Sequence, residues 1–126
     1  MNYENFEIIL VDNNSTDGTI EFITKNYPSI IILKLDSNRG FAEPNNIGAK
    51  IAKGKYLLFL NNDTVVTPNF ISEMVKVIEK DKKIAICQSL LLRLDGSIDS
   101  SGDFIDRLGV VYNSTTKINE IREISS

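Results

Sequence analysis

Apolar residues in this chain fall into short runs separated by polar loops, and their spacing predicts strands and helices in alternation. Four runs rich in β-branched or aliphatic residues predict strands over residues 6–11, 30–35, 56–60 and 84–92. Apolar residues at helical spacing predict three helices between these strands, over about 20–27, 44–53 and 67–80. Strands and helices alternating at this spacing predict an α/β fold, with a mostly parallel sheet covered by helices on both faces.

Two local signals refine this pattern. Gly48 and Ala52 give the second predicted helix a face of small residues, which suits close packing on a sheet. After Leu92 the alternation ends, and Asp95-Gly96 is a hairpin signal. We therefore expect a short antiparallel part that includes residues 104–112, while residues 117–126 fit an amphipathic strand, a short helix or a frayed end.

The composition indicates one folded domain over residues 1–126, with a single core, and excludes several classes of protein. Hydrophobic residues make up 42% of the chain, and the net charge of −3 leaves no large basic surface for nucleic acid. The longest apolar runs have four residues, too short to cross a bilayer, and the polar amino terminus does not resemble a secretory signal. We therefore expect a cytoplasmic protein. The absence of histidine excludes histidine-ligated zinc.

Three polar loops follow the first three predicted strands, at residues 12–18, 36–41 and 61–64. In an open parallel sheet, ligands bind beyond the carboxyl ends of the strands, because the loops and helix amino termini meet there. We therefore expect these three loops to line one ligand-binding edge.

Asp63 follows the apolar third strand almost directly, so its carboxylate should lie at the edge of the sheet. Magnesium or manganese needs only one or two protein carboxylates beside water and a substrate's phosphates. The alternative is that Asn62 or Asp63 only caps a turn. Because Asp63 would face two similar loops, we favour Mg²⁺ or Mn²⁺ binding.

The other candidates are side chains that could contact a nucleotide. Asp12 and Asn13 offer the acceptors and the amide donor needed to read a base edge, but a turn that starts the next helix explains them equally well. Asn38, Arg39 and Gly40 could approach a ribose or a diphosphate, with Arg39 neutralising charge. Amides in the first turn of the second helix, Asn46 among them, either cap that helix or point at the same ligand.

The sequence lacks the motifs of several families of nucleotide- and phosphate-binding proteins. The chain has no Gly-x-Gly-x-x-Gly motif and no P-loop, which argues against a Rossmann dehydrogenase and a P-loop kinase. A phosphoryl-accepting receiver domain would need a lysine where Arg93 follows the fourth strand. A haloacid-dehalogenase-type phosphatase would need an aspartate where the chain has Asn61.

Three linked segments carry a resemblance to a known family: VDNNSTDGT at 11–19, NRGFAEPNNIG at 38–48 and LFLNNDT at 58–64. Together they resemble the family 2 glycosyltransferases, especially the rhamnosyltransferase-like branch. The resemblance implies a GT-A fold, a nucleotide-diphosphate sugar donor, a divalent cation and a glycan or lipid-linked acceptor. It also implies inverting transfer, by a hexosyl- or rhamnosyltransferase-like enzyme of cell-wall or polysaccharide biosynthesis.

The same resemblance implies roles for individual residues. Asp12 and Asn13 would contact the base, and Asn38 and Gly40 the ribose or phosphate side of the donor. The Asn62-Asp63 pair would stand where the family has its Asp-x-Asp metal motif. An asparagine in place of one acid should weaken metal binding.

Two departures from the family pattern lead to further expectations. The strand and helix that normally precede the first matching segment are missing, and the chain stops before the acceptor-binding part, so we assign no catalytic base. We therefore expect a partial domain, truncated at both ends, with peripheral membrane association of the full-length parent. Unpaired strand edges predict a homodimer or a rearranged sheet. The alternative function is an inactive nucleotide-sugar-binding module.

Overall fold

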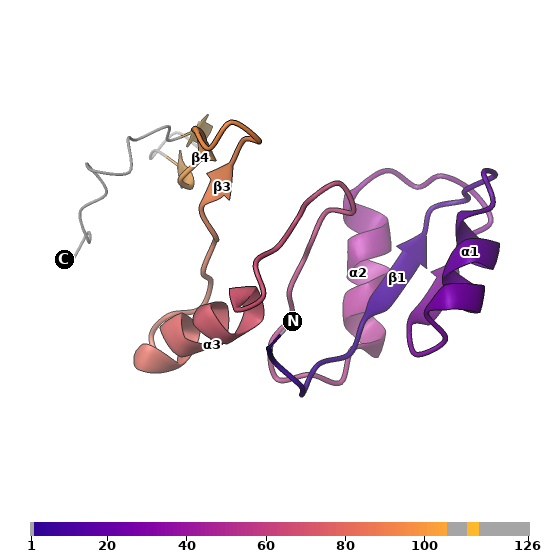
Figure 1. The fold of residues 1–126 in the computed structure, drawn as a ribbon, viewed down its shortest axis with the longest axis horizontal. Helices are drawn as coiled ribbons and strands as arrows, with labels where there is room; N and C mark the ends of the chain where they lie inside the picture. Colours follow the sequence, from indigo (N-terminus) through magenta and orange to yellow (C-terminus); the bar gives the residue numbers. More distant parts are fainter. Residues whose placement is uncertain (1, 106–110, 114–126) are drawn as a thin grey trace. The chain divides into compact units, whose positions relative to one another are not determined.

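The computed structural model describes residues 2–105 and 111–113 (Figure 1). The chain divides into two compact units, one formed by residues 3–67 and the other by residues 1–2 together with 68–126. The predicted element at 117–126 lies outside the described residues.

The first unit contains a parallel pair of strands and two helices, in the order β1 (Ile9–Asp12), α1 (Thr19–Asn26), β2 (Ile31–Lys34) and α2 (Ala42–Ile51). β1 and β2 pair in parallel, with Ile9 opposite Ile31 and Asp12 opposite Lys34. The predictions of the first two strands and the first two helices are therefore confirmed, with slightly shifted bounds.

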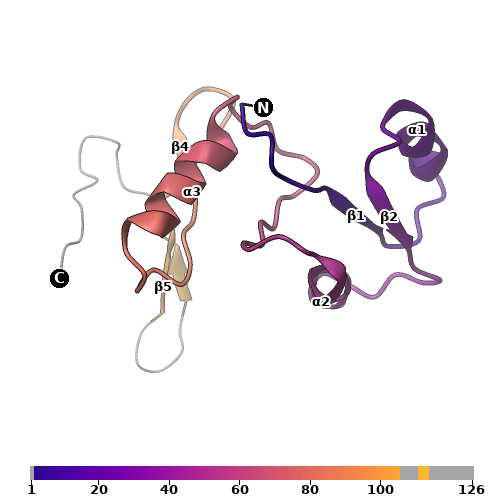
Figure 2. The ribbon, with the colours of Figure 1, turned by 90° about the horizontal axis from the view of Figure 1, so that it is seen from below.

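The two helices of this unit lie on opposite sides of the strand pair (Figure 2). α2 packs on β1, and Gly48 lies at the contact. A Cβ atom at position 48 would lie 3.0 Å from Cγ2 of Val11 and 3.8 Å from Cγ2 of Ile9. The small residue at this position therefore lets the helix approach the strand closely, as predicted for Gly48, whereas Ala52 follows the end of α2 with an extended backbone.

A carboxylate joins the chain before β1 to the turn after α2. Oε1 of Glu7 accepts hydrogen bonds from the backbone N–H groups of Lys53, at 2.6 Å, and Gly54, at 3.0 Å. The partners are 46 and 47 residues apart in sequence. This contact fixes where the chain leaves α2.

The predicted third strand at 56–60 is wrong. The sheet of this unit has only β1 and β2, and residues 57–60 are irregular and exposed. A strand needs a neighbouring strand to pair its backbone N–H and C=O groups, and no ladder joins this segment to β1. The apolar pattern alone therefore did not determine a strand.

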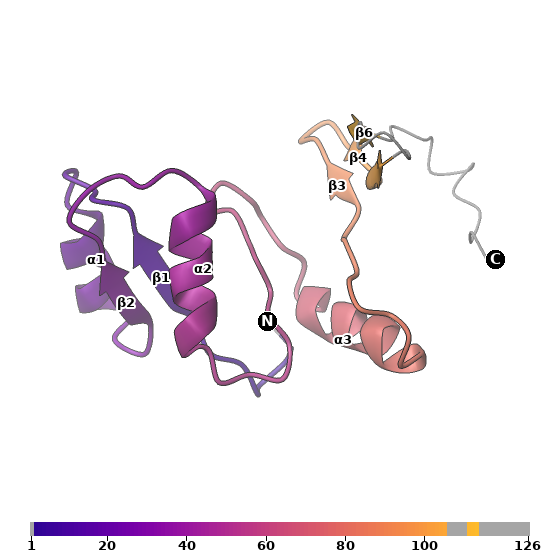
Figure 3. The same ribbon diagram turned by 180° about the vertical axis from the view of Figure 1, so that it is seen from behind.

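The second unit begins with α3 (Phe70–Lys80), which confirms the third predicted helix with a slightly later start. The following strands are β3 (Leu91–Leu92), β4 (Ile98–Ser100), β5 (Asp103–Ile105) and β6 (Val111–Asn113). They form two antiparallel pairs, β3 with β4 and β5 with β6. Figure 3 labels β3, β4 and β6 in this group of strands. The predicted antiparallel part is therefore confirmed.

The hairpin between β3 and β4 forms around Asp95-Gly96. The N–H of Arg93 donates to the carbonyl of Ser97 at 2.8 Å, and Gly96 adopts a left-handed backbone with φ of 81°. The predicted fourth parallel strand at 84–92 is wrong. Only its last two residues form a strand, and this strand pairs with β4 in antiparallel orientation. The turn at Asp95-Gly96 therefore accounts for the antiparallel pairing of β3 with β4.

The single hydrophobic core expected from the composition is not seen in the described part of the chain. Among residues 2–102, no aliphatic or aromatic side chain is buried; Pro44 and Gly48 of α2 and the polar residues Asp12 and Ser100 are. No helix among the described residues is long and apolar enough to span a membrane. Whether residues 1–126 form a single domain stays a prediction.

Candidate functional site

Asp12 ends β1 and is 4% exposed. Its two carboxylate oxygens accept the backbone N–H of Ser15 at 3.2 and 3.3 Å, and its carbonyl accepts the N–H of Leu35 at 2.9 Å. The side chain therefore closes the turn that leaves the strand, which is the local interpretation considered from sequence. Contact between Asp12 and a base stays a prediction.

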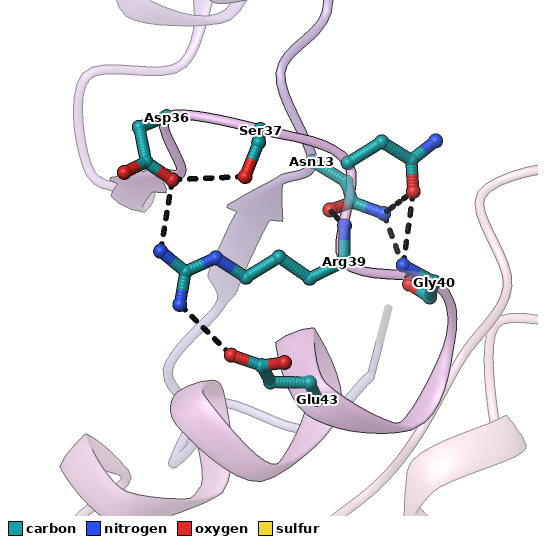
Figure 4. Close-up of polar contacts among 7 residues, drawn as sticks. Asn13, Asp36, Ser37, Arg39, Gly40 and Glu43 are labelled. Carbon is teal, nitrogen blue, oxygen red and sulfur yellow. Dashed lines mark hydrogen bonds and ion pairs between the residues drawn. The ribbon is translucent and has the colours of Figure 1, made fainter.

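Asn13 connects the loop after β1 to the loop after β2 (Figure 4). Its Nδ2 donates to Oδ1 of Asn38 and to the carbonyl of Gly40, both at 2.9 Å. Its Oδ1 accepts the backbone N–H of Arg39 at 2.8 Å. Oδ1 of Asn38 also accepts the N–H of Gly40 at 2.9 Å. Four of the predicted site residues are therefore joined directly.

Arg39 is held between two carboxylates (Figure 4). One guanidinium nitrogen lies 2.8 Å from Oδ1 of Asp36, and another lies 2.8 Å from Oε1 of Glu43. Hydrogen bonds from Arg39 and then Ser37 lower the pKa of the Asp36 carboxyl group, and the two carboxylates raise the pKa of Arg39. The positive charge predicted to face a diphosphate is thus already paired within the loop.

The two side-chain amides in the first turns of α2, Asn45 and Asn46, differ in their contacts. Asn45 donates its Nδ2 to the carbonyl of Phe41 at 2.9 Å, which is a local bond within the first turn. Asn46 is exposed. The structure therefore gives a local role for Asn45, and the ligand contact of Asn46 stays a prediction.

Asn62 and Asp63 lie in an exposed turn after the irregular segment 56–60. The turn is supported by Oγ1 of Thr64, which donates to the carbonyl of Asn61 at 2.7 Å. In residues 3–67, no hydrogen bond or ion pair joins Asp63 to Asp12, Asn13 or the 36–41 loop. Two of the three predicted loops are therefore brought together by direct contacts, and the third is not.

The predicted metal site has few carboxylate donors near it. Among the described residues no group of three or more Asp, Glu, Cys or His side chains could enclose a metal ion. A single exposed carboxylate at Asp63 fits a Mg²⁺ or Mn²⁺ ion that keeps several waters and binds phosphate oxygens. Metal binding stays a prediction.

Sequence reasoning missed the two carboxylates that hold Arg39. Their signal was the spacing, since Asp36 and Glu43 stand three residues before and four residues after the arginine. It also missed an open hollow of about 440 Å³ beside the first loop, lined by Asn14, Ser15, Thr16, Gly18, Ile20, Glu21 and Lys34. Both features adjoin the carboxyl ends of β1 and β2.

The family model described as "Glycosyl transferase family 2" matches residues 1–100. Among similar proteins, UDP-Glc:alpha-D-GlcNAc-diphosphoundecaprenol beta-1,3-glucosyltransferase WfaP of Escherichia coli is 40% identical over 64% of this chain and 32% of its own length. O-antigen biosynthesis protein RfbC of Myxococcus xanthus is 34% identical over 85% of this chain and 8% of its own length. Poly(ribitol-phosphate) beta-glucosyltransferase of Bacillus spizizenii is 36% identical over 50% of this chain and 11% of its own length.

The chain thus spans about a third or less of the length of the curated relatives it matches. No solved structure is significantly similar to it.

Proposed function

The chain belongs to glycosyltransferase family 2, and from that premise we propose that it supplies the donor-binding part of a sugar-transferring enzyme. The donor would be a nucleotide-diphosphate sugar, and the acceptor a hydroxyl group on a glycan or lipid-linked molecule. The observation that carries this proposal is the set of hydrogen bonds from Asn13 to Asn38, Arg39 and Gly40, which joins two of the three family motifs at one edge of the strand pair.

The proposed roles follow the chemistry of each side chain. Asp12 and the loop after β1 would face the base, and the backbone of Asn38 and Gly40 would lie beside the ribose or diphosphate. Asn46 and Asn62 would add amide contacts, and Asp63 would hold Mg²⁺ or Mn²⁺. When bound, such an ion neutralises the charge that develops on a departing diphosphate.

The proposed reaction is inverting. An acceptor oxygen attacks the sugar carbon from the side opposite the diphosphate, the new C–O bond forms as the bond to the diphosphate breaks, and the acceptor proton passes to a base. None of the described residues is assigned as that base. Holding the two reactants in this geometry would be the main contribution of the protein.

The proposed biological setting is the assembly of a cell-wall or surface polysaccharide in the cytoplasm, with peripheral membrane association of the full-length parent. Support comes from the relatives, whose names refer to an undecaprenol-linked acceptor, to O-antigen biosynthesis and to poly(ribitol-phosphate). Two of these names describe glucosyltransferases, so we favour hexosyl over rhamnosyl transfer.

The donor site can be tested by titration calorimetry on the 126-residue chain. UDP, GDP, ADP and dTDP would each be titrated with and without MnCl₂, and UDP-glucose would serve as the sugar-bearing probe. We expect metal-dependent binding of at least one nucleotide. Asp63→Asn should weaken the metal-dependent part by about tenfold or more, whereas Asp81→Asn, at the end of α3, should leave it unchanged.

Each result of the titration bears on a different proposal: the donor site, the metal role of Asp63, or enzymatic activity. Absence of metal-dependent binding for every nucleotide would remove the donor site. An unchanged affinity in Asp63→Asn would remove the metal role of that residue. Binding without sugar transfer or donor hydrolysis in the full-length parent would favour the inactive nucleotide-sugar-binding module.

A further inference from the structure

We infer that Asn13 is a positioning residue, whose carboxamide holds the 36–41 loop in place and has no amide donor left to read the donor base. This inference rests on the proposed function for its meaning, since the loop it holds is the one proposed to face the ribose and diphosphate. Its structural basis is independent of that function. Asn13 is half-buried, and its partners lie 25 to 27 residues further along the chain.

The first argument is the number of hydrogen bonds that the Asn13 side chain can form. A carboxamide has two N–H donors and an oxygen that can accept two hydrogen bonds. Both donors of Asn13 are directed at loop oxygens, on Asn38 and Gly40, and its oxygen accepts the N–H of Arg39. A base contact through the amide nitrogen would therefore have to break a bond that holds the loop.

The orientation of the amide is fixed by its backbone partners. The N–H of Arg39 can only donate and the carbonyl of Gly40 can only accept, so the oxygen of Asn13 must face the first and its nitrogen the second. In the same way the N–H of Gly40 requires the oxygen of Asn38. The four bonds therefore form one consistent set.

The loop is held from a second direction as well. The Arg39 side chain extends to Asp36 and Glu43, while its backbone N–H donates to Asn13 (Figure 4). Gly40 has a left-handed backbone with φ of 73°, which lets the chain turn around the two amides. The loop conformation thus depends on Asn13 from the side of β1, and on the ion pairs of Arg39 with Asp36 in the loop and Glu43 in α2.

This arrangement predicts that two nearly isosteric substitutions have opposite results. Asn13→Asp replaces the donating nitrogen by an anionic oxygen that faces two acceptor oxygens, so the loop should detach. Asn38→Asp keeps the one atom that Asn38 uses, because Oδ1 accepts both of its bonds. The loop should therefore stay in place. A residue that only read a base would not produce this contrast in the absence of ligand.

The test is amide hydrogen exchange by NMR on the 126-residue chain. In Asn13→Asp, exchange at Arg39 and Gly40 should accelerate about tenfold, as expected for the loss of loop hydrogen bonds. In Asn38→Asp, exchange at both amides should stay within about twofold of the original protein. Gln88→Glu, in the other unit, adds the same charge and should change neither amide.

A second pair of variants keeps the inference falsifiable if Asn13→Asp does not fold. Asn38→Ala removes the acceptor of Gly40 but not that of Arg39, so only exchange at Gly40 should accelerate. Asn13→Ala should accelerate exchange at Arg39. Equal exchange at both amides in all four variants and the original protein would overturn the inference.

Titration with UDP and MnCl₂ separates this inference from the proposed function. If the original protein does not bind the nucleotide, the proposed function fails, while the exchange measurements still decide the role of Asn13. If it binds, Asn13→Asp should bind less tightly through loss of the loop. Binding lost in Asn13→Asp with exchange unchanged would identify Asn13 as a direct base contact and overturn the inference.

Discussion

Arg39 shows how a charged residue can be used within a loop before any ligand arrives. Its side chain is 35% exposed and its guanidinium contacts a carboxylate on each side, so a diphosphate would have to compete with Asp36 and Glu43. Exposed ion pairs of this kind contribute little to stability on their own, but two of them on one guanidinium restrict its position. The contacts of Arg39 therefore hold the loop in its conformation, and a donor diphosphate could bind this guanidinium only in competition with them.

The Asp36–Arg39 pair predicts a specific pH dependence. Because the folded pKa of Asp36 is lowered from its ordinary value of 3.8, its contribution to loop stability is present above that value and is lost as the pH falls through the lowered folded pKa. Substituting Arg39→Gln should move the titration midpoint of Asp36 upward, toward its ordinary value. The measurement is a carbon-13 NMR titration of the carboxyl group. The same midpoint in both proteins would contradict the assignment.

At the scale of elements, the contact between α2 and β1 depends on a position without a side chain. Gly48 is buried against Val11 and Ile9, and glycine is otherwise unfavourable inside a helix. The close approach explains why it is present. It also ties the position of α2 directly to β1, beside the strand pairing that joins β1 to β2.

Gly48→Ala should therefore destabilise the chain despite the better helix propensity of alanine. Overpacking against Val11 costs about 1–3 kcal/mol, while the gain in propensity is about 1 kcal/mol. We expect the midpoint of urea unfolding to fall. Lys50→Ala, on the exposed part of the same helix, is the control and should leave the midpoint unchanged or slightly raised. A raised midpoint in Gly48→Ala would show that Val11 can move aside.

The elements that the sequence predicts well are those determined by neighbouring residues. Helical spacing identified α1, α2 and α3, and the Asp95-Gly96 turn identified the hairpin. The segment at 56–60 has the same apolar character as β1, but a strand also requires a paired neighbour, which no local pattern supplies. Likewise the bonds from Asn13 to a loop 25 residues away were not predictable, although the shared edge of the two loops was.

At the scale of the whole molecule, the described chain leaves much apolar surface in contact with water. Leu57, Leu58, Phe59 and Leu60 are 52%, 45%, 58% and 49% exposed. Exposed apolar segments with strand-like sequence tend to pair with another chain. The homodimer expected from the sequence stays a prediction, and we propose the exposed segment at 57–60 as its contact surface.

Self-association can be measured by sedimentation over a range of protein concentrations. We expect the original chain to shift from monomer to dimer as the concentration rises, and Leu58→Lys to stay monomeric, because a charge in this segment opposes pairing. Leu94→Lys, in the exposed hairpin turn, is the matched control and should dimerise like the original. A monomer at every concentration would refute the homodimer.

The bonds from Glu7 to the backbone of Lys53 and Gly54 make residues 7–54 a closed ring, although no covalent crosslink is present. One carboxylate thus constrains both ends of the β1–α1–β2–α2 segment in the way a crosslink would, but reversibly. Because the entropy of closing a ring rises only slowly with its length, insertions in the connecting loops would weaken this closure little. We therefore expect insertions in the loops between β1 and α2 to leave the bonds from Glu7 to Lys53 and Gly54 in place.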